Sequence, residues 1–288
     1  MPEHAFELEM PGGRLSGTLL LPEGAGPWPA ALLIAGSGPT DRDGNNPLLQ
    51  IRVNNLKRLA QELAARGIAS LRYDKRGVGE SIHPGLSEQA LRFDHLVDDA
   101  VACATWLDAD PQVTRVVLVG HSEGALIAAL AAERAPAHAL VSVAGAGSRA
   151  STLMRKQIEG QLPDDLAGPA LAALTALEAG ETAEVPDDLV LLFRPTVQPY
   201  LISWFRHDPR EVLARLQVPV LVVQGEADPQ VSVEQAHLLK AGRPDARLLL
   251  LPKMDHLFAL RGDVGPGAKA IAGEMAVWLR ELDARVAA

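Results

Sequence analysis

The sequence predicts an α/β fold in which a mainly parallel sheet is flanked by helices. Short apolar runs of strand length alternate along the chain with amphipathic segments of helix length. Most of these runs are continuously apolar, as is typical of strands that helices cover on both faces. The chain has 288 residues, which is enough for one large domain or for a core with a modest insertion.

The first half of the chain begins with a hairpin and continues with strand–helix units. Residues 5–10 and 15–21 flank the turn Pro11-Gly12-Gly13-Arg14, which indicates two antiparallel strands. The units expected next are a strand at 30–35, a helix at 48–66, a strand at 68–73, a helix at 96–107, a strand at 116–119, a helix at 125–134 and a strand at 139–143. Because strand and helix alternate, the crossovers should be right-handed.

The alternation is interrupted between residues 148 and 210. Prolines punctuate a helical or irregular sequence there, at Pro163, Pro169, Pro186, Pro195 and Pro199. We therefore expect an insertion at 148–210 that packs over a core formed by residues 1–147 and 211–288. The pattern then resumes with a strand at 218–223, a helix at 233–241, a strand at 246–251 and a helix at 267–286.

The composition excludes several classes of partner and site. Hydrophobic residues make up 48% and charged residues 22%, as in ordinary globular proteins. No apolar run reaches the roughly 18 residues of a membrane span, and no secretory signal follows Met1, so a cytoplasmic location is the default expectation. The net charge of −9 argues against nucleic acid or an anionic membrane as partner. Cys103 is the only cysteine, which excludes an internal disulfide and a cysteine-rich metal site.

Nucleophilic chemistry is indicated by Gly120-His121-Ser122-Glu123-Gly124, a G-x-S-x-G pattern between an expected strand and an expected helix. In this context the serine occupies a strained turn with its hydroxyl exposed, and the glycines let the strand and helix approach. The N-terminus of the helix adds free N–H groups and a positive dipole. Ser122 is therefore the candidate nucleophile, and a serine that only caps the helix is the alternative.

A serine hydroxyl needs a base, and in this kind of sheet an acid and then a histidine follow the serine along the chain. Asp228 lies in the loop after the strand at 218–223, and His256 lies in the loop after the strand at 246–251. We expect Asp228 to orient His256, which takes the proton of Ser122. Glu226 is the second candidate for the acid, and a helix-capping role is the alternative for Asp228.

The other histidines give no support for a metal site. His121 adjoins the serine on a sharp turn and should point elsewhere, and His237 lies in an expected helix. The remaining histidines have no supporting context: His4, His83, His95, His138 and His207. Because no pair has metal-ligand spacing with a third ligand nearby, we expect no metal, and the serine chemistry requires no cofactor.

The developing negative charge on a substrate oxygen needs hydrogen-bond donors. The backbone N–H of Glu123, directly after the serine, is one candidate. The second is the N–H of Ser37, in the glycine-rich loop that follows the strand at 30–35. A phosphate-binding loop is the alternative for Gly36-Ser37-Gly38, but no Gly-Lys-Ser/Thr follows and the Rossmann spacing is absent.

A charged turn at 72–81 follows another expected strand. It contains Asp74, Lys75 and Arg76 among several glycines. We expect these side chains to order the loop beside the active site, with direct contact to the substrate as the alternative.

Four segments together carry a resemblance to a known family. They are GSGPTDRDGN at 36–45, YDKRGVGES at 73–81, GHSEG at 120–124 and FRPTVQPYL at 193–201. With the histidine loop they span nearly the whole chain, and they resemble the α/β-hydrolase superfamily. Within it, the chain is similar to a group of bacterial carboxylesterases and serine-aminopeptidase-like hydrolases. Ala125 stands where a third glycine is common in this group.

The resemblance implies the α/β-hydrolase fold, with a mainly parallel eight-stranded sheet and an inserted helical cap between the sixth and seventh strands. It implies Ser122, Asp228 and His256 as catalytic triad, and the N–H groups of Ser37 and Glu123 as oxyanion hole. It also implies activity on esters with short acyl chains.

Aromatic residues of the expected cap are candidates for contact with a substrate. In such folds the pocket lies under the cap and has an apolar lining, so we assign Tyr200, Trp204 and Phe205 to this role. Packing of the cap on the core is the alternative for these residues. Arg194 and Arg206 are candidates for contact with a carboxylate on the substrate.

Three classes of function remain. The first is a carboxylesterase that cleaves small esters through an acyl-serine, and the second is a peptidase, amidase or thioesterase with the same triad. For an amide substrate, acidic residues of the cap could hold an amine: Asp164, Asp165, Asp187 and Asp188. The third class is a binding protein without activity. The expected partner is a small-molecule ester, and assembly into a homo-oligomer is compatible with the sequence.

Overall fold

The computed structural model describes residues 1–48, 50 and 52–286. Its strands are β1 (Glu3–Met10), β2 (Gly13–Leu20), β3 (Trp28–Ile34), β4 (Ala69–Tyr73), β5 (Val113–His121), β6 (Ala139–Val143), β7 (Val220–Gly225) and β8 (Arg247–Leu251). Its α-helices are α1 (Asn55–Ala64), α2 (Phe93–Asp108), α3 (Glu123–Ala132), α4 (Ala150–Gln161), α5 (Asp164–Glu178), α6 (Val190–Phe193), α7 (Gln198–Phe205), α8 (Pro209–Arg215), α9 (Val233–Gly242) and α10 (Val264–Val286). Two short 3₁₀ helices are η1 (Glu88–Ala90) and η2 (Asp187–Leu189).

The strands form a single eight-stranded sheet in the order β1-β2-β4-β3-β5-β6-β7-β8. β1 pairs antiparallel with β2, and β2 pairs antiparallel with β4. All other pairs are parallel, so the carboxyl ends of β3 to β8 meet at one edge of the sheet. This arrangement confirms the predicted mainly parallel, eight-stranded α/β fold.

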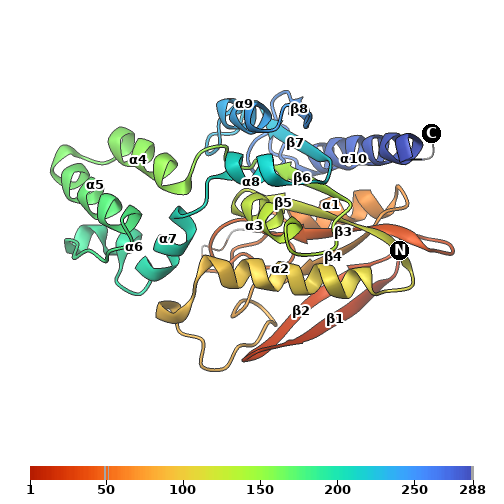
Figure 1. The fold of residues 1–288 in the computed structure, drawn as a ribbon, viewed down its shortest axis with the longest axis horizontal. Helices are drawn as coiled ribbons and strands as arrows, with labels where there is room; N and C mark the ends of the chain where they lie inside the picture. Colours follow the sequence, from red (N-terminus) through yellow and green to blue (C-terminus); the bar gives the residue numbers. More distant parts are fainter. Residues whose placement is uncertain (49, 51, 287–288) are drawn as a thin grey trace.

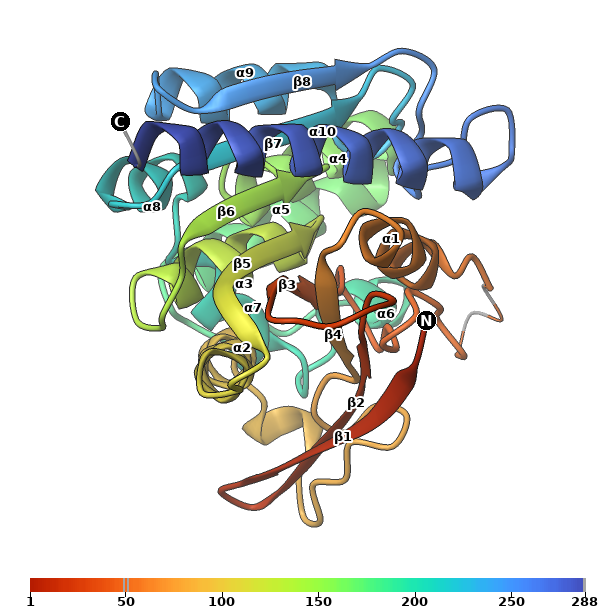
Figure 2. The same cartoon turned by 90° about the vertical axis from the view of Figure 1, so that its right-hand side faces the viewer.

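Helices cover both faces of the sheet (Figures 1 and 2). Residues of α2, α3, α8 and α9 share one hydrophobic cluster with one set of strand side chains, and residues of α1 and α10 share a second cluster with the other set. Leu32 and Leu33 of β3 show the alternation, because neighbouring residues of a strand point to opposite faces. Both are buried, as the continuous apolar runs predict. None of the helices in the described ranges has the length and apolarity needed to cross a bilayer.

The helix predicted at 48–66 is shorter in the structure. Its predicted first turns include residues 49 and 51, which lie outside the described residues. The observed helix α1 begins at Asn55, because Asn54 has a left-handed backbone with a φ of 53°. The carboxamide oxygen of Asn45 accepts the N–H groups of Val53 and Asn54, at 2.8 and 2.9 Å. The chain before α1 is thereby hydrogen-bonded to the preceding loop instead of continuing the helix.

Helices α4 to α7 lie between β6 and β7 in sequence and stand beyond the carboxyl edge of the sheet (Figure 1). They have a hydrophobic cluster of their own, which includes Leu174, Phe193 and Leu201. We call residues 148–208 the helical insertion. Helix α8, which follows it, contacts α3 and α9 and belongs to a layer that covers the sheet.

Candidate active site

Ser122 lies at a sharp turn between β5 and α3, at the carboxyl edge of the sheet. Its backbone has φ 55° and ψ −120°, a conformation that non-glycine residues rarely adopt. The N–H of Ser122 donates to the carbonyl oxygen of Val143 in the neighbouring strand, at 2.9 Å. This hydrogen bond to the neighbouring strand helps to keep Ser122 in its strained backbone conformation.

The two glycines of the G-x-S-x-G motif stand where a side chain would collide with backbone. A Cβ atom at Gly120 would lie 2.0 Å from the carbonyl oxygen of Gly124, and one at Gly124 would lie 2.4 Å from that of Ile34. Both distances are far shorter than a van der Waals contact. The turn thus needs glycine at these positions so that α3 can pack closely on β3 and β5.

His256 and Asp228 come from the loops after β8 and β7 and form a buried pair. The Nδ1–H of His256 donates to Oδ2 of Asp228 at 2.8 Å. The Asp228 side chain is fully buried and that of His256 is 6% exposed. With the proton on Nδ1, the Nε2 atom of His256 is the acceptor, which is the tautomer that a general base requires. His256 and Ser122 line the same cavity.

Asp228 accepts four hydrogen bonds. Its Oδ1 binds the N–H groups of Gln230 and Val231, at 2.8 and 2.9 Å, and its Oδ2 binds His256 and the side-chain amide of Gln224, the latter at 3.1 Å. Burial would raise the pKa of Asp228, but the hydrogen bonds and charge of His256, with the two backbone donors, hold the pKa below its usual value. The carboxylate therefore stays ionised beside the imidazole.

His121 supports the loop that carries His256. Its Nε2–H donates to the carbonyl oxygen of His256 at 2.8 Å, and its ring packs edge-on against Phe258. Burial, together with the nearby His256, lowers the pKa of His121 to about 3. His121 is therefore a neutral, structural donor, although it also lines the smaller cavity at Ser122.

Two cavities meet at Ser122 and Ser37. The larger, of about 260 Å³, lies between α3 and the helical insertion and is lined by Ser37, Ser122, Glu123, Leu126, Ala146, Ala150, Leu153, Met154, Gln157, Trp204, Pro209, Gln230 and Val231. The smaller, of about 200 Å³, is lined by Gly36, Ser37, Thr40, Gly44, Asn46, His121, Ser122, Gln230, His256 and Leu257. The larger cavity is predominantly lined by apolar residues, whereas the smaller one carries mostly polar residues, including His256.

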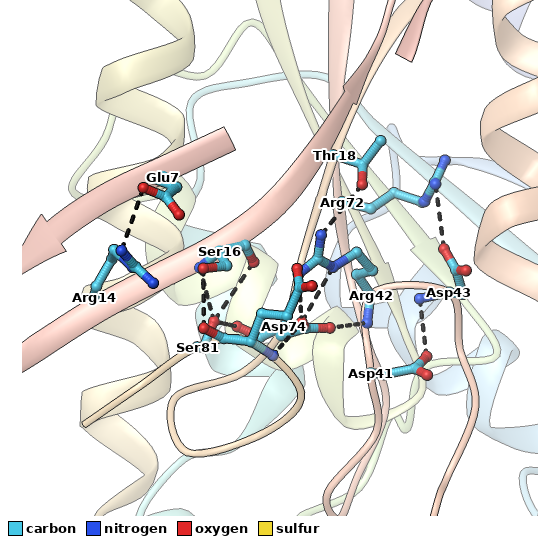
Figure 3. Close-up of polar contacts among 11 residues, drawn as sticks. Glu7, Arg14, Ser16, Thr18, Asp41, Arg42, Asp43, Arg72, Asp74 and Ser81 are labelled. Carbon is cyan, nitrogen blue, oxygen red and sulfur yellow. Dashed lines mark hydrogen bonds and ion pairs between the residues drawn. The ribbon is translucent and has the colours of Figure 1, made fainter. Parts of the chain in front are cut away.

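The loop that holds Ser37 is fixed by ion pairs to the turn after β4 (Figure 3). The N–H and guanidinium groups of Arg42 donate to both carboxylate oxygens of Asp74, at 2.6 to 3.1 Å, and Arg42 also reaches Glu80 at 2.7 Å. The side chain of Asp74 is 3% exposed. In the same turn, Arg76 forms a two-point ion pair with Asp99 of α2. The charged turn therefore orders the loop beside the active site.

The other predicted site residues lie in different surroundings. Trp204 lines the larger cavity, and its ring stacks on Phe93 of α2. Tyr200 lines a separate cavity beyond Glu123, and Phe205 is buried in the hydrophobic cluster of the insertion. Glu226, the second candidate for the acid, is exposed.

Neither arginine that we considered for a substrate carboxylate lines a cavity at Ser122. Arg194 is paired with Glu88, and Arg206 lies at a pocket beside the start of α2. Within residues 1–48, 50 and 52–286, no group of three or more His, Cys, Asp or Glu side chains is placed to hold a metal ion.

Sequence reasoning missed Gln224 and did not anticipate the direct partner of Lys75. Gln224 is fully buried, and its amide donates to Asp228 and to the carbonyl oxygen of Val231, at 3.1 and 2.8 Å. Lys75, expected only as general support for the loop, contacts Glu123 directly. A polar residue at the end of the apolar run of β7 was the one available signal for Gln224.

Comparisons with known proteins find similarity to hydrolases. A family model described as "Serine aminopeptidase, S33" matches residues 52–166. Esterase EstD of Thermotoga maritima is 30% identical over 263 residues, which are 89% of this chain and 61% of that protein. The chain therefore spans about three fifths of the length of this curated relative.

Solved structures show the same fold. Est1E from Butyrivibrio proteoclasticus, solved with ferulic acid bound, superposes with a TM-score of 0.67 at 18% identity, over 97% of this chain and 100% of that one. A proline iminopeptidase from Mycobacterium smegmatis superposes with a TM-score of 0.66 at 18% identity, over 98% of this chain and 100% of that one. At such identities the likeness concerns the fold.

Proposed function

We propose that this chain is a serine hydrolase of the α/β-hydrolase superfamily that cleaves small carboxylic esters with short acyl chains. One observation carries the proposal. A serine on a strained turn and a histidine bonded to a buried carboxylate line one cavity at the carboxyl edge of the sheet. The likeness to an esterase over most of the chain supports the same activity.

The proposed reaction has two half-reactions with an acyl-serine between them. Ser122 Oγ attacks the carbonyl carbon while Nε2 of His256 takes its proton, and Asp228 stabilises the imidazolium. The N–H groups of Ser37 and Glu123 stabilise the oxyanion. His256 then protonates the departing alcohol. Water, activated by His256, attacks the acyl-serine and releases the acid.

The two cavities favour a division of the substrate between them. The departing oxygen must lie within hydrogen-bond reach of His256, so the alcohol belongs in the smaller cavity, which His256 lines. The acyl chain then occupies the larger cavity against Leu126, Met154 and Trp204. The limited size of that cavity, about 260 Å³, agrees with short acyl chains.

The proposal treats residues 148–210 as a helical cap over the core of residues 1–147 and 211–288. It is supported by the contribution of Leu153, Met154, Gln157 and Trp204 to the larger cavity. The boundary at 210 falls within α8, whose packing on α3 and α9 favours an end of the cap near Asp208.

A peptidase or amidase with the same triad is the second candidate, because the matching family model carries a serine aminopeptidase description. Among the described residues that line the larger cavity, Glu123 is the only ionisable one, and it is paired with Lys75. The acidic residues proposed to hold an amine begin α5 and η2 and line neither cavity at Ser122: Asp164, Asp165, Asp187 and Asp188. Ester cleavage is therefore favoured over cleavage at a peptide amino terminus.

Hydrolysis of a matched panel tests the proposal. The panel comprises nitrophenyl esters from acetate to dodecanoate, a thioester and an aminoacyl anilide, and a fluorophosphonate probe tests labelling of the serine. We expect esters with short chains to react fastest, and Ser122→Ala to lose both labelling and at least about 10³-fold in kcat with its fold intact. Ser87→Ala, at an exposed position, is the control. Unchanged ester turnover in Ser122→Ala would reject the assignment, faster anilide cleavage would favour the peptidase, and a silent, unlabelled protein would favour a binding role.

A further inference from the structure

Lys75 places an ammonium group behind the two N–H groups that we assign to the oxyanion hole. Its Nζ donates to the carbonyl oxygen of Gly36, and to that of Gly38 at 3.4 Å. The same Nζ contacts Oε1 of Glu123 at 3.1 Å. The side chains of Lys75 and Glu123 are 7% and 2% exposed, so the ion pair is shielded from water.

The peptide geometry gives these contacts a chemical meaning. The carbonyl of Gly36 and the N–H of Ser37 belong to one planar peptide unit. A donor on that carbonyl fixes the plane, and therefore the direction of the N–H, and it polarises the unit so that the N–H becomes a better donor. The second N–H belongs to Glu123 itself, and the contact of its carboxylate with Lys75 fixes the position of that residue. One ammonium group thus reaches both sides of the oxyanion hole.

The helical insertion completes the enclosure of Glu123. The Tyr200 hydroxyl of α7 lies close to the Glu123 side chain, and burial together with this carboxylate raises the pKa of that hydroxyl well above its ordinary value, so the hydroxyl stays protonated beside Glu123. Glu123 is therefore held between a cation from the turn after β4 and a hydroxyl from the insertion. Its carboxylate is not available as a proton acceptor for the reaction.

We propose that Lys75 is a positioning residue that orients and polarises the two oxyanion donors at Ser37 and Glu123. Stability alone does not account for such a pair, because the desolvation of two buried charges offsets much of their attraction. A fixed geometry of donors accounts for it, since stabilisation of an oxyanion depends on donors that are oriented before the reaction begins. The proposal rests on the function proposed above.

Four variants of the full chain test this proposal. Lys75→Met removes the charge but leaves Glu123 buried without its cation, so the double variant Lys75→Met/Glu123→Gln removes both charges and guards against misfolding. Lys75→Arg retains the charge with a different reach. Lys269→Met, at an exposed position of α10, is the matched control. The measurements are the circular dichroism spectrum, kcat and KM for a short-chain nitrophenyl ester, and the inhibition constant of a trifluoromethyl ketone.

We expect the folded double variant to lose about 10- to 100-fold in kcat while KM changes less than about threefold, because the lost interaction acts on the transition state. The trifluoromethyl ketone forms an adduct with the serine that carries an oxyanion, so its affinity should weaken in proportion to kcat/KM. Lys75→Arg should recover part of both losses, and Lys269→Met should match the parent protein.

A folded double variant with kcat and inhibitor affinity within about twofold of the parent would overturn the role of Lys75. So would a loss that appears only in thermal stability, or only in KM, because a merely structural or substrate-binding residue would behave in this way. These results differ from failure of the proposed function, in which Ser122→Ala would retain turnover. If Ser122→Ala is inactive and the double variant is fully active, only the inference about Lys75 is wrong.

Discussion

The two walls that face Ser122 are built from different kinds of contact. On the side of the sheet, hydrogen bonds define the wall, and Asp228 alone accepts four of them. On the side of the helical insertion, apolar side chains such as Leu153, Met154 and Trp204 define it. Removing one partner of a buried hydrogen bond leaves the other group unpaired and costs stability. An apolar wall, by contrast, accepts substitution by another apolar side chain of similar volume. We therefore expect catalysis to depend on the first wall and selectivity on the second.

Asp228→Asn is the strongest test of the polar wall. The variant retains a similar shape but donates to His256 instead of accepting from it, so the imidazole adopts the wrong tautomer. We expect kcat for a short-chain ester to fall about 10³- to 10⁴-fold with the fold retained. Glu226→Gln is the matched control and should stay within about twofold. Activity in Asp228→Asn near that of the parent would show that this carboxylate does not orient the base.

His121→Gln tests the polar wall through the pH dependence of stability. The folded protein lowers the pKa of His121 from 6.5 to about 3. The unfolded chain therefore takes up a proton first as the pH falls, so this contribution to stability is complete above pH 6.5 and is lost toward pH 3. Between pH 6.5 and 4.5 the loss amounts to about 2 kcal/mol.

Glutamine retains an amide donor for the carbonyl of His256 but does not titrate. Urea unfolding of His121→Gln at the two pH values should therefore show a smaller loss of unfolding free energy than the parent, by about 2 kcal/mol. His237→Gln, at an exposed position of α9, is the control. An acid slope equal to that of the parent would contradict the neutral state assigned to His121.

Gln224→Met asks whether the outer donors of Asp228 also contribute to turnover. Methionine has a side chain of similar length, but it lacks the amide group that donates hydrogen bonds to Asp228 and to the carbonyl oxygen of Val231. We expect kcat to fall about tenfold, with a smaller change in KM, because the carboxylate becomes less firmly oriented. Gln217→Met, at an exposed position, should have no effect. An unchanged kcat would show that the hydrogen bond from Gln224 to Asp228 does not contribute to turnover.

Met154→Ala tests the apolar wall and should have the smallest effect on the reaction itself. A shorter side chain lengthens the larger cavity, so the ratio of kcat/KM for octanoate to that for butyrate should rise about fivefold. The rate on acetate should change little. Leu191→Ala, which alters an exposed residue of α6, is the control. A fall in rate that is uniform across chain lengths would place the acyl group elsewhere.

The sequence was sufficient to predict the centre of the sheet because the strands there are buried on both faces. The apolar runs that became β3, β5, β6 and β7 have no amphipathic alternative, and the observed strands overlap the predicted ones within a few residues. The candidates Ser122, Asp228 and His256 were identifiable because each follows a strand, and parallel strands end at one edge. The contact between Asp228 and His256, at 2.8 Å, agrees with that reasoning.

Other features depend on contacts that no local pattern encodes. Lys75 and Glu123 are 48 residues apart, and their ion pair depends on how two loops close at the sheet edge. The prediction placed the start of α1 too early because the helical spacing of apolar residues already includes Val53. In the structure, the side-chain oxygen of Asn45 accepts the backbone N–H groups of Val53 and Asn54, and the helix begins after them. In both cases a polar side chain from another segment decides the local structure, and periodicity carries no information about it.

The way the helical insertion is attached has a consequence for the whole architecture. The side chains of Arg149 and Asp208, at its two ends, approach to 3.7 Å, so the two ends are within side-chain reach of each other. Helix α8 already provides the crossover from β6 to β7 on its own. Length and shape of the intervening helices are thus free to vary between homologues, or to be exchanged by grafting, while the order of the strands and the register of β6 against β7 stay the same.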